Sequence, residues 1–287
     1  GTSGVKTALV SSAGKIIAFE FEPTPVFYIP GGGAEQDPAD WWRALVSTCR
    51  RLTSAGHVSP DSIAAVCCSS TFSSTVIVDE AGVPLMNSLT WLDSRGAPYV
   101  RKTMRGVLNI EGYAARKALR WIRLAGGAPA LSGKDDMGHV LYVRHARPEV
   151  YRGAHMFLGS KDFLNHRLTG RFAATFDSIA LFWLADIRDI DYVKYDRRLF
   201  SMLGVDPDKF PPLMKSTDIL GPVLPEVADE IGVPRGTPVA AGSPDLQSAC
   251  IGSGAVRDFE GHIYIGTSSW ILCHVPFKKT DVRHIIT

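Results

Sequence analysis

The sequence has 287 residues, of which 45% are hydrophobic, so it can bury a substantial core and is not a disordered chain. Its 31 Lys and Arg residues nearly balance its 29 Asp and Glu residues. The formal net charge of +2 provides no field that favours nucleic acid or an anionic membrane surface as a partner. The composition leaves a small molecule or another protein as the expected partner.

The five cysteines are an odd number, widely spread and without a CxxC pair, which argues against a disulfide framework and a zinc site. The sequence therefore predicts a reducing, cytoplasmic environment. It contains no run of about 20 apolar residues and no basic and apolar leader. Because it starts at Gly1 without Met and stops abruptly at Thr287, we expect it to be an excised piece of a longer chain.

The amino-terminal segment predicts a hairpin followed by a helix. Two β-rich runs within residues 5–22 flank the turn residues Ala13 and Gly14. Asp37 then provides a helix N-cap and Pro38 a first-turn proline. The apolar face that follows has helical spacing and comprises Trp41, Trp42, Leu45, Val46, Cys49 and Leu52.

Three further strands are expected in residues 62–70, 74–80 and 87–93, which makes this an α/β domain. Residues 94–205 are richer in helical patterns, including a helix that ends at Gly170. Residues 226–242 predict a short helix, a turn and a strand. The small residues of 246–256 suggest a helix packed very close to its neighbours.

A Gly-Thr-Ser step occurs twice, at the start of residues 1–10 and of residues 266–275, each time before an apolar strand-like run. Such turns offer backbone N–H groups and hydroxyls without bulk, which is what nucleotide phosphates require. Two ordinary hairpin turns are the alternative. Lys6 could likewise meet a phosphate or be a solvated strand lysine.

Asp245 is the carboxylate with the most suggestive position, directly after an apolar strand and before the small-residue helix. Ligands of α/β sheets bind at such strand ends, and a carboxylate there can take a proton from a hydroxyl. Capping of the helix is the alternative role. Asp93 and Arg95 could line a cleft, but we favour a structural ion pair. No metal-site spacing, GxSxG, Walker A or GxGxxG motif is present.

In their order and spacing, several segments resemble the amino-terminal domain of the FGGY-family carbohydrate kinases, and xylulokinase-like members most. These segments are residues 1–10, 31–42, 78–96, 160–170, 236–256 and 264–270. The resemblance implies an actin-like (ribonuclease H-like) ATPase fold, with a mixed sheet flanked by helices. In this fold two related domains enclose ATP and Mg²⁺, and the sugar lies mostly against the first domain.

The resemblance also implies roles for individual residues. Asp245 matches the catalytic aspartate, a general base that accepts the proton of the attacking sugar hydroxyl. The family's metal-holding aspartate would precede Gly1, so no metal ligand is assigned in this sequence. The positions implied to bind the nucleotide phosphates are Thr2, Ser3, Lys6, Gly266 and Thr267.

The expected sugar-binding positions depart from the xylulokinase pattern. Thr71, Phe72, Ser73 and Ser74 stand where xylulokinases usually read Gln-Met-His-Gly, and Leu246 stands where Asn is common. We expect Thr71, Phe72, Ser73 and Asp245 to contact the substrate. Because hydrogen-bonding groups of the usual pattern are missing, xylulose itself is doubtful as the substrate.

The sequence therefore predicts an ATP-dependent kinase for a sugar or polyol, of the xylulokinase-like ketose kinase type. Residues 1–252 would be the sugar-binding domain, and residues 253–287 the truncated start of the nucleotide-binding domain. The alternatives are a kinase for a shorter polyol such as glycerol or erythritol, and a non-catalytic actin-like nucleotide-binding module. A homodimer is possible by analogy with the family.

Overall fold

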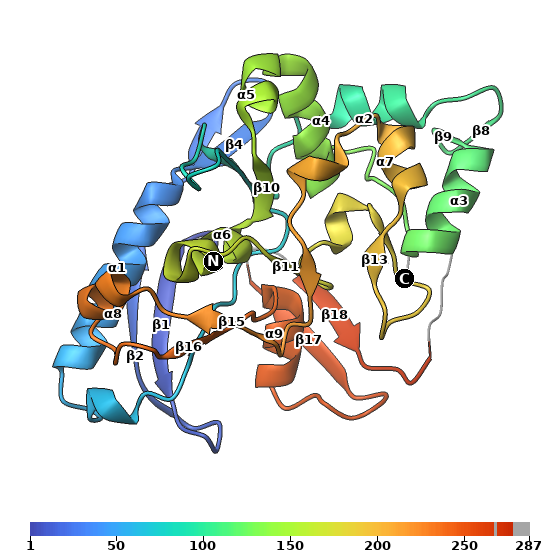
Figure 1. Ribbon diagram of the computed structural model, residues 1–287. Helices are drawn as coiled ribbons and strands as arrows, with labels where there is room; N and C mark the ends of the chain where they lie inside the picture. Colours follow the sequence, from blue (N-terminus) through green and yellow to red (C-terminus); the bar gives the residue numbers. More distant parts are fainter. Residues whose placement is uncertain (267–268, 278–287) are drawn as a thin grey trace.

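The computed structural model describes residues 1–266 and 269–277, which form a mixed α/β structure (Figure 1). The helices are α1 (Pro38–Ser54), α2 (Ala97–Met104), α3 (Ala115–Ala125), α4 (Asp136–Ala146), α5 (Pro148–Gly153), α6 (Ser160–Thr169), α7 (Arg197–Leu203), α8 (Pro225–Ile231) and α9 (Asp245–Gly252). Among the described residues, no helix has the length and apolar character that crossing a membrane requires.

The strands are mostly short. In chain order they are β1 (Gly4–Val10), β2 (Ile16–Pro23), β3 (Phe27–Ile29), β4 (Gly33–Gln36), β5 (Val66–Cys67), β6 (Thr75–Val78), β7 (Ser88–Leu89), β8 (Asn109–Ile110), β9 (Tyr113–Ala114), β10 (Met156–Gly159), β11 (Ala174–Thr175), β12 (Ala185–Asp186), β13 (Lys194–Tyr195), β14 (Leu213–Met214), β15 (Ile219–Pro222), β16 (Pro238–Ala240), β17 (Gly261–Ile265) and β18 (Ser269–Cys273). The three strands expected from residues 62–70, 74–80 and 87–93 are present as β5, β6 and β7, each shorter than its apolar run.

The predicted hairpin and the helix after it are confirmed. Strands β1 and β2 pair antiparallel, and α1 begins where Asp37 accepts a hydrogen bond from the Ala39 N–H at 2.8 Å. The helix lies against the hairpin, with the hydroxyls of Thr7 and Thr48 2.7 Å apart. Its expected apolar face is buried, except that Cys49 is half-buried.

A five-stranded antiparallel sheet, in the order β10-β6-β7-β4-β3, separates two hydrophobic cores. Successive side chains of a strand point to opposite faces, and β6 follows this rule. Val76 and Val78 pack with residues of α1, α6 and α8, whereas Ile77 packs with residues of α2, α3, α4 and α7. Because both faces are covered, all four residues of β6 are buried, which explains its unbroken apolar run.

Strands β15, β16 and β5 form a smaller sheet in which β16 runs parallel to β5. The first residue after β16, Ala241, accepts hydrogen bonds through its carbonyl from Lys161 Nζ at 3.0 Å and Asn165 Nδ2 at 2.7 Å, both on α6. Lys161 is 1% exposed and pairs with Asp162 at 2.5 Å. This buried pair fixes the strand end from which the chain turns into α9.

Helix α9 occupies the segment predicted as a close-packed helix, but the packing is not close. A Cβ added at Gly252 would meet no atom within 4 Å, and Cys250 is its one buried residue. The small residues here therefore reflect an open position beside the hairpin β17–β18, visible in Figure 1.

Candidate active site

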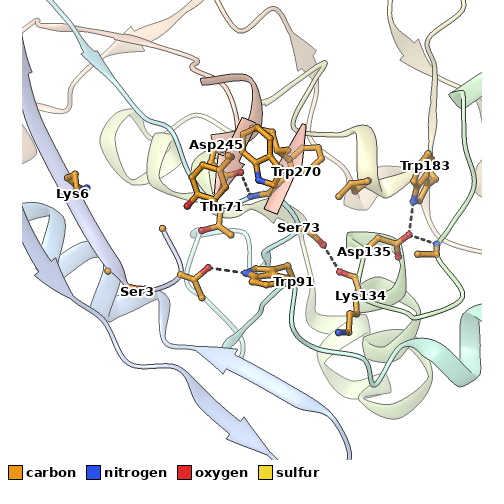
Figure 2. Close-up of a pocket in the computed structure, with 18 of the residues that line it drawn as sticks. Ser3, Lys6, Thr71, Ser73, Trp91, Lys134, Asp135, Trp183, Asp245 and Trp270 are labelled. Carbon is orange, nitrogen blue, oxygen red and sulfur yellow. Dashed lines mark hydrogen bonds between the residues drawn. The ribbon is translucent and has the colours of Figure 1, made fainter. Parts of the chain in front are cut away.

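A cavity of about 650 Å³ lies where the start of β1, the 71–74 loop, the start of α9 and the β17–β18 hairpin meet. It is lined by Gly1, Thr2, Ser3, Gly4, Lys6, Phe21, Thr71, Phe72, Ser73, Trp91, Ala130, Lys134, Asp135, Leu181, Trp183, Asp245, Leu246, Tyr264 and Trp270. Seven of the predicted site residues are thus brought together from three distant segments. Figure 2 shows Lys6 on one side, Lys134 and Trp183 on the other, and Thr71 and Asp245 between them.

Asp245 is held at the cavity by a short chain of backbone constraints. Gly242 leaves β16 with a left-handed φ of 71°, and Pro244 pairs with Ser70 in a parallel bridge. The Asp245 N–H then donates to the Ser70 carbonyl at 2.8 Å. The strand-end, helix-start position predicted for Asp245 is therefore present.

The Asp245 carboxylate reaches across to the 71–74 loop, where Oδ1 accepts from the Phe72 N–H at 3.1 Å. The N-cap of α9 is Pro244, which provides no side-chain hydrogen bond. Asp245 is open to solvent through the cavity, yet the surrounding protein removes part of its water, and this desolvation raises the pKa of the carboxyl. A higher pKa makes the carboxylate a better proton acceptor.

The 71–74 loop is itself held from behind. Ser73 has a left-handed φ of 54°, unusual for a residue with a side chain, and its hydroxyl donates to the Lys134 carbonyl at 2.8 Å. Ser160 Oγ, at the start of α6, lies 2.8 Å from Ser70 Oγ. The 71–74 loop, which holds Asp245, is therefore itself held by residues at the starts of two helices, α4 and α6.

The turn before β1 forms the opposite side of the cavity. Thr2 Oγ1 accepts from Trp91 Nε1 at 2.9 Å, and the Thr2 carbonyl accepts from Gln36 Nε2 at 3.1 Å. Lys6 is exposed and has no ion-pair partner among the residues that the structure describes. A second cavity of about 210 Å³ also contacts Lys6, Thr71 and Asp245, so these three side chains lie between two hollows.

The second Gly-Thr-Ser step is only partly visible. Gly266 is exposed after β17 and does not line the cavity, and Thr267 lies outside the described residues. Tyr264 and Trp270, on the two strands beside this step, do line the cavity and stack with ring centroids 4.8 Å apart. The hairpin therefore reaches the cavity, and the roles of Gly266 and Thr267 stay predictions.

Asp93 and Arg95 form a structural cluster, as favoured from the sequence. Asp93 is fully buried and accepts from the Ala34 N–H at 3.0 Å. Arg95 pairs with Asp93 and with Glu35, each at 2.6 Å, and donates to the Tyr142 hydroxyl at 3.0 Å. Neither Asp93 nor Arg95 lines the cavity.

A group of residues at the far side of the cavity was not expected from the sequence. Asp135 caps α4 and accepts from Trp183 Nε1 at 2.7 Å, and both residues line the cavity together with Lys134 and Leu181. Burial raises the pKa of Asp135 to about 6 against three N–H donors that favour its charged form. The one available signal was the Lys134-Asp135-Asp136 run before an apolar segment, which is equally typical of any capped helix.

Asp136 lies behind the loop and is buried. Burial raises the pKa of its carboxyl to about 7, although Thr75 Oγ1 donates a hydrogen bond to it at 2.7 Å. Between the ordinary value of 3.8 and about 7 the folded state keeps a proton that the unfolded chain has lost, so stability falls as pH rises through this window. Asp136→Asn, which stays neutral, should therefore gain stability relative to the parent as pH rises from about 4 to about 7, by on the order of several degrees in the unfolding midpoint.

Thermal unfolding of the complete protein and of this variant across that pH range measures the difference. Asp61→Asn, at an exposed position, is the matched control and should track the parent. A constant offset between Asp136→Asn and the parent at every pH would contradict the prediction.

The chain is similar to known proteins over most of its length. A sequence profile described as "FGGY family of carbohydrate kinases, N-terminal domain" matches residues 1–252. The xylulose kinase of Bacillus subtilis (strain 168) is 28% identical over 284 residues, which cover 99% of this chain and 54% of that protein. The gluconokinase of the same organism is 24% identical over 284 residues, covering 99% of this chain and 52% of that protein.

Among solved structures, the xylulose kinase from Rhodospirillum rubrum superposes with a TM-score of 0.87 at 21% identity, covering 98% of this chain and 55% of that one. This likeness confirms the predicted actin-like ATPase fold. The chain spans about half the length of the curated relatives it matches.

Proposed function

The chain belongs to the FGGY family of carbohydrate kinases, and we propose that it carries the acceptor-binding part and the general base of an ATP-dependent kinase for a sugar or polyol. One observation supports this most: Asp245 and the 71–74 loop share a cavity with Thr2, Ser3 and Lys6. A proton acceptor, Asp245, thus faces the same cavity as Thr2, Ser3 and Lys6, which we call the phosphate-type turn. Transfer of a phosphoryl group to a hydroxyl requires this arrangement.

In the proposed reaction, Asp245 accepts the proton of an acceptor hydroxyl while that oxygen forms a bond to the terminal phosphorus of ATP. The bond from this phosphorus to the bridging oxygen breaks, and ADP leaves with the electron pair. The Phe72 N–H holds Oδ1 of Asp245 and so directs the carboxylate toward the acceptor. The raised pKa of Asp245 improves its basicity for this step.

The residues at the start of β1 fit a phosphate group. A Cβ added at Gly4 would lie 2.3 Å from the carbonyl oxygen of Glu22 on β2, so only glycine allows β1 to approach β2 this closely beside the cavity. Thr2 and Ser3 bring hydroxyls to the cavity, and Lys6 is a cation without an acidic partner among residues 1–266 and 269–277. We assign phosphate groups of ATP to these residues.

Mg²⁺, when bound with ATP, would neutralise phosphate charge during transfer. This ion takes one or two carboxylates and fills its other positions with phosphate oxygens and water. Asp245 lines the cavity, but its oxygen that does not accept the Phe72 N–H is the proposed proton acceptor, and both oxygens of Asp135 already accept N–H donors, so we assign no residue of this chain to the ion. Among the described residues, no group of three potential metal-ligating acidic, His or Cys side chains is clustered.

The acceptor is proposed to be a ketose or polyol, with a shorter polyol such as glycerol or erythritol as the alternative. Thr71, Phe72 and Ser73 line the cavity beside Asp245, and so does Leu246. The Leu246 side chain cannot form a hydrogen bond. It therefore distinguishes polyols by the positions of their hydroxyl groups less well than an Asn at this position would. Because two of its relatives are a xylulose kinase and a gluconokinase, xylulose and gluconate are the first acceptors to try.

The proposal is tested by ATP consumption of the complete protein in which this chain occurs, measured against a panel of ketoses, polyols and sugar acids. We expect at least one acceptor to stimulate ATP consumption well above the rate without acceptor. The same measurement with Lys6→Gln should show weaker ATP binding, since a phosphate-facing cation is lost. Tight ATP binding with no stimulation by any acceptor would instead indicate a non-catalytic nucleotide-binding module.

We also propose a cytoplasmic location. All five cysteines lie within the described residues and are free thiols. Burial raises the pKa of Cys68 to about 12 and that of Cys49 to about 11, so both are unreactive. A chain with five unpaired thiols suits a reducing compartment.

A further inference from the structure

Trp183 forms the end of the cavity that lies away from the phosphate-type turn. It lines the cavity beside Leu181 and Ala130, which are apolar. Figure 2 shows Trp183 on the side opposite Lys6, with Thr71 and Asp245 between them. A molecule that meets Asp245 and extends away from Lys6 therefore approaches Trp183.

The backbone of Trp183 is in an unfavourable conformation that its neighbours maintain. It has φ 57° and ψ 30°, in the left-handed region that bulky residues rarely adopt. Its carbonyl accepts from Trp121 Nε1 at 3.0 Å, and Trp121 is 0% exposed in the core. Such conformations persist where the surrounding structure over-determines them, and they are concentrated at functional sites.

The side chain of Trp183 is fixed as firmly as its backbone. Its indole N–H donates to Asp135 Oδ2 at 2.7 Å. Asp135 is 4% exposed, and its two oxygens also accept from the Ala130 N–H at 2.6 Å and the Gly138 N–H at 2.8 Å. Because an indole has one donor and no acceptor, Trp183 has no hydrogen bond left for a ligand and presents only its ring to the cavity.

We propose that Trp183, positioned by Asp135, is a specificity-determining residue that limits the length of the acceptor. The ring is an apolar wall that the last carbon of the acceptor contacts, and an acceptor one carbon longer meets it sterically. This inference rests on the proposed function, since it takes Asp245 as the residue that meets the reacting hydroxyl.

The test uses the complete protein and a series of ketoses and polyols that lengthens by one carbon at a time. Trp183→Gly removes the wall, and glycine adopts the left-handed backbone without strain, so this variant is expected to fold. Its kcat/KM should shift to longer acceptors, with a gain of about tenfold or more for the first acceptor beyond the parent's optimum. Trp183→Phe keeps a ring at this place and should keep the parent's optimum length.

Trp91→Phe is the matched control within the cavity. Trp91 also lines the cavity, and its indole N–H also donates to a protein acceptor, Thr2 Oγ1. It differs from Trp183 in lying on the side of the phosphate-type turn. Its replacement should change activity toward all acceptors by a common factor. A length profile that changes with Trp91→Phe as it does with Trp183→Gly would overturn the assignment to Trp183.

Asp135 is tested as a positioning residue by its dependence on Trp183. Asp135→Asn removes one of the oxygens that hold the Trp183 indole and the N–H groups of Ala130 and Gly138. It should raise KM for the acceptor several-fold with little change in kcat. In the Trp183→Gly background it should have no further effect on KM, whereas an effect through helix capping alone would be equal in both backgrounds.

The outcomes separate this inference from the proposed function. A parent protein that no acceptor stimulates contradicts the proposed function. An active parent whose length profile is unchanged by Trp183→Gly overturns the inference and leaves the proposed function standing. A shift to longer acceptors, absent in Trp183→Phe, supports both.

Discussion

Asp245→Asn in the complete protein is expected to lower kcat for phosphoryl transfer by about a hundredfold to ten-thousandfold, the range that general-base catalysis contributes. The amide keeps the size of the carboxylate, and its oxygen can still accept the Phe72 N–H that Oδ1 accepts at 3.1 Å. It cannot take a proton from the acceptor. Steady-state kinetics with a stimulating acceptor and ATP binding by calorimetry measure the two effects, and ATP affinity should stay close to that of the parent.

The pH profile provides a second measurement of the same group. Desolvation raises the pKa of Asp245 above its ordinary 3.8, so the parent should lose activity on the acid side as this carboxylate gains a proton. Asp258→Asn, an exposed carboxylate outside the cavity, should keep both the rate and the acid limb. Near-parental turnover of Asp245→Asn would remove Asp245 from the reaction.

Gly242→Ala is expected to lower the free energy of unfolding by about 2–4 kcal/mol and kcat by about tenfold or more. Gly242 has φ 71°, and a Cβ there would lie 2.0 Å from the Cys68 carbonyl oxygen. Since this oxygen belongs to the backbone, the chain must move. The movement falls three residues before Asp245, so the carboxylate proposed as the base shifts away from the acceptor.

Two other glycines separate the causes of this effect. Gly236 has φ 88° but open space around its Cβ position, so Gly236→Ala carries only backbone strain, about 1–2 kcal/mol. Gly252→Ala carries neither strain nor a clash, because no atom lies within 4 Å of the added Cβ. Chemical denaturation and steady-state kinetics of the three variants are compared. Gly242→Ala with the stability of Gly236→Ala and full activity would show that the close approach to Cys68 is unimportant.

The elements predicted with success have local causes. Asp37 and Pro38 define the start of α1, and Gly170 ends α6 in the left-handed conformation. The order β10-β6-β7-β4-β3 has no such local signal where β10 joins β6 and β7 joins β4, because these neighbours are far apart in the chain. The extents of β5 and β7 also depend on the strands they pair with, β16 for β5 and β4 and β6 for β7, and the apolar runs around them continue past the last paired residue.

Some residues of the candidate site could likewise be recognised from the sequence, and others could not. Asp245 was found because a strand end before a helix is visible in the sequence, and Thr2, Ser3 and Lys6 because of a repeated turn. Trp183 was missed because a tryptophan at a cavity and one in the core, such as Trp121, follow the same apolar pattern. Only the indole partner distinguishes them, and for Trp183 that partner, Asp135, is 48 residues away. The division into residues 1–252 and 253–287 stays a prediction.

The hydrogen bond between the Phe72 N–H and Asp245 Oδ1 spans 173 residues, and the bridge of Ser70 with Pro244 spans a similar distance. Contacts of such separation form late in folding, because closing a long loop costs entropy before the contact is gained. During synthesis Asp245 therefore stays apart from the 71–74 loop until nearly the whole segment has left the ribosome. A nascent chain with a finished hairpin and α1 still has no complete candidate site.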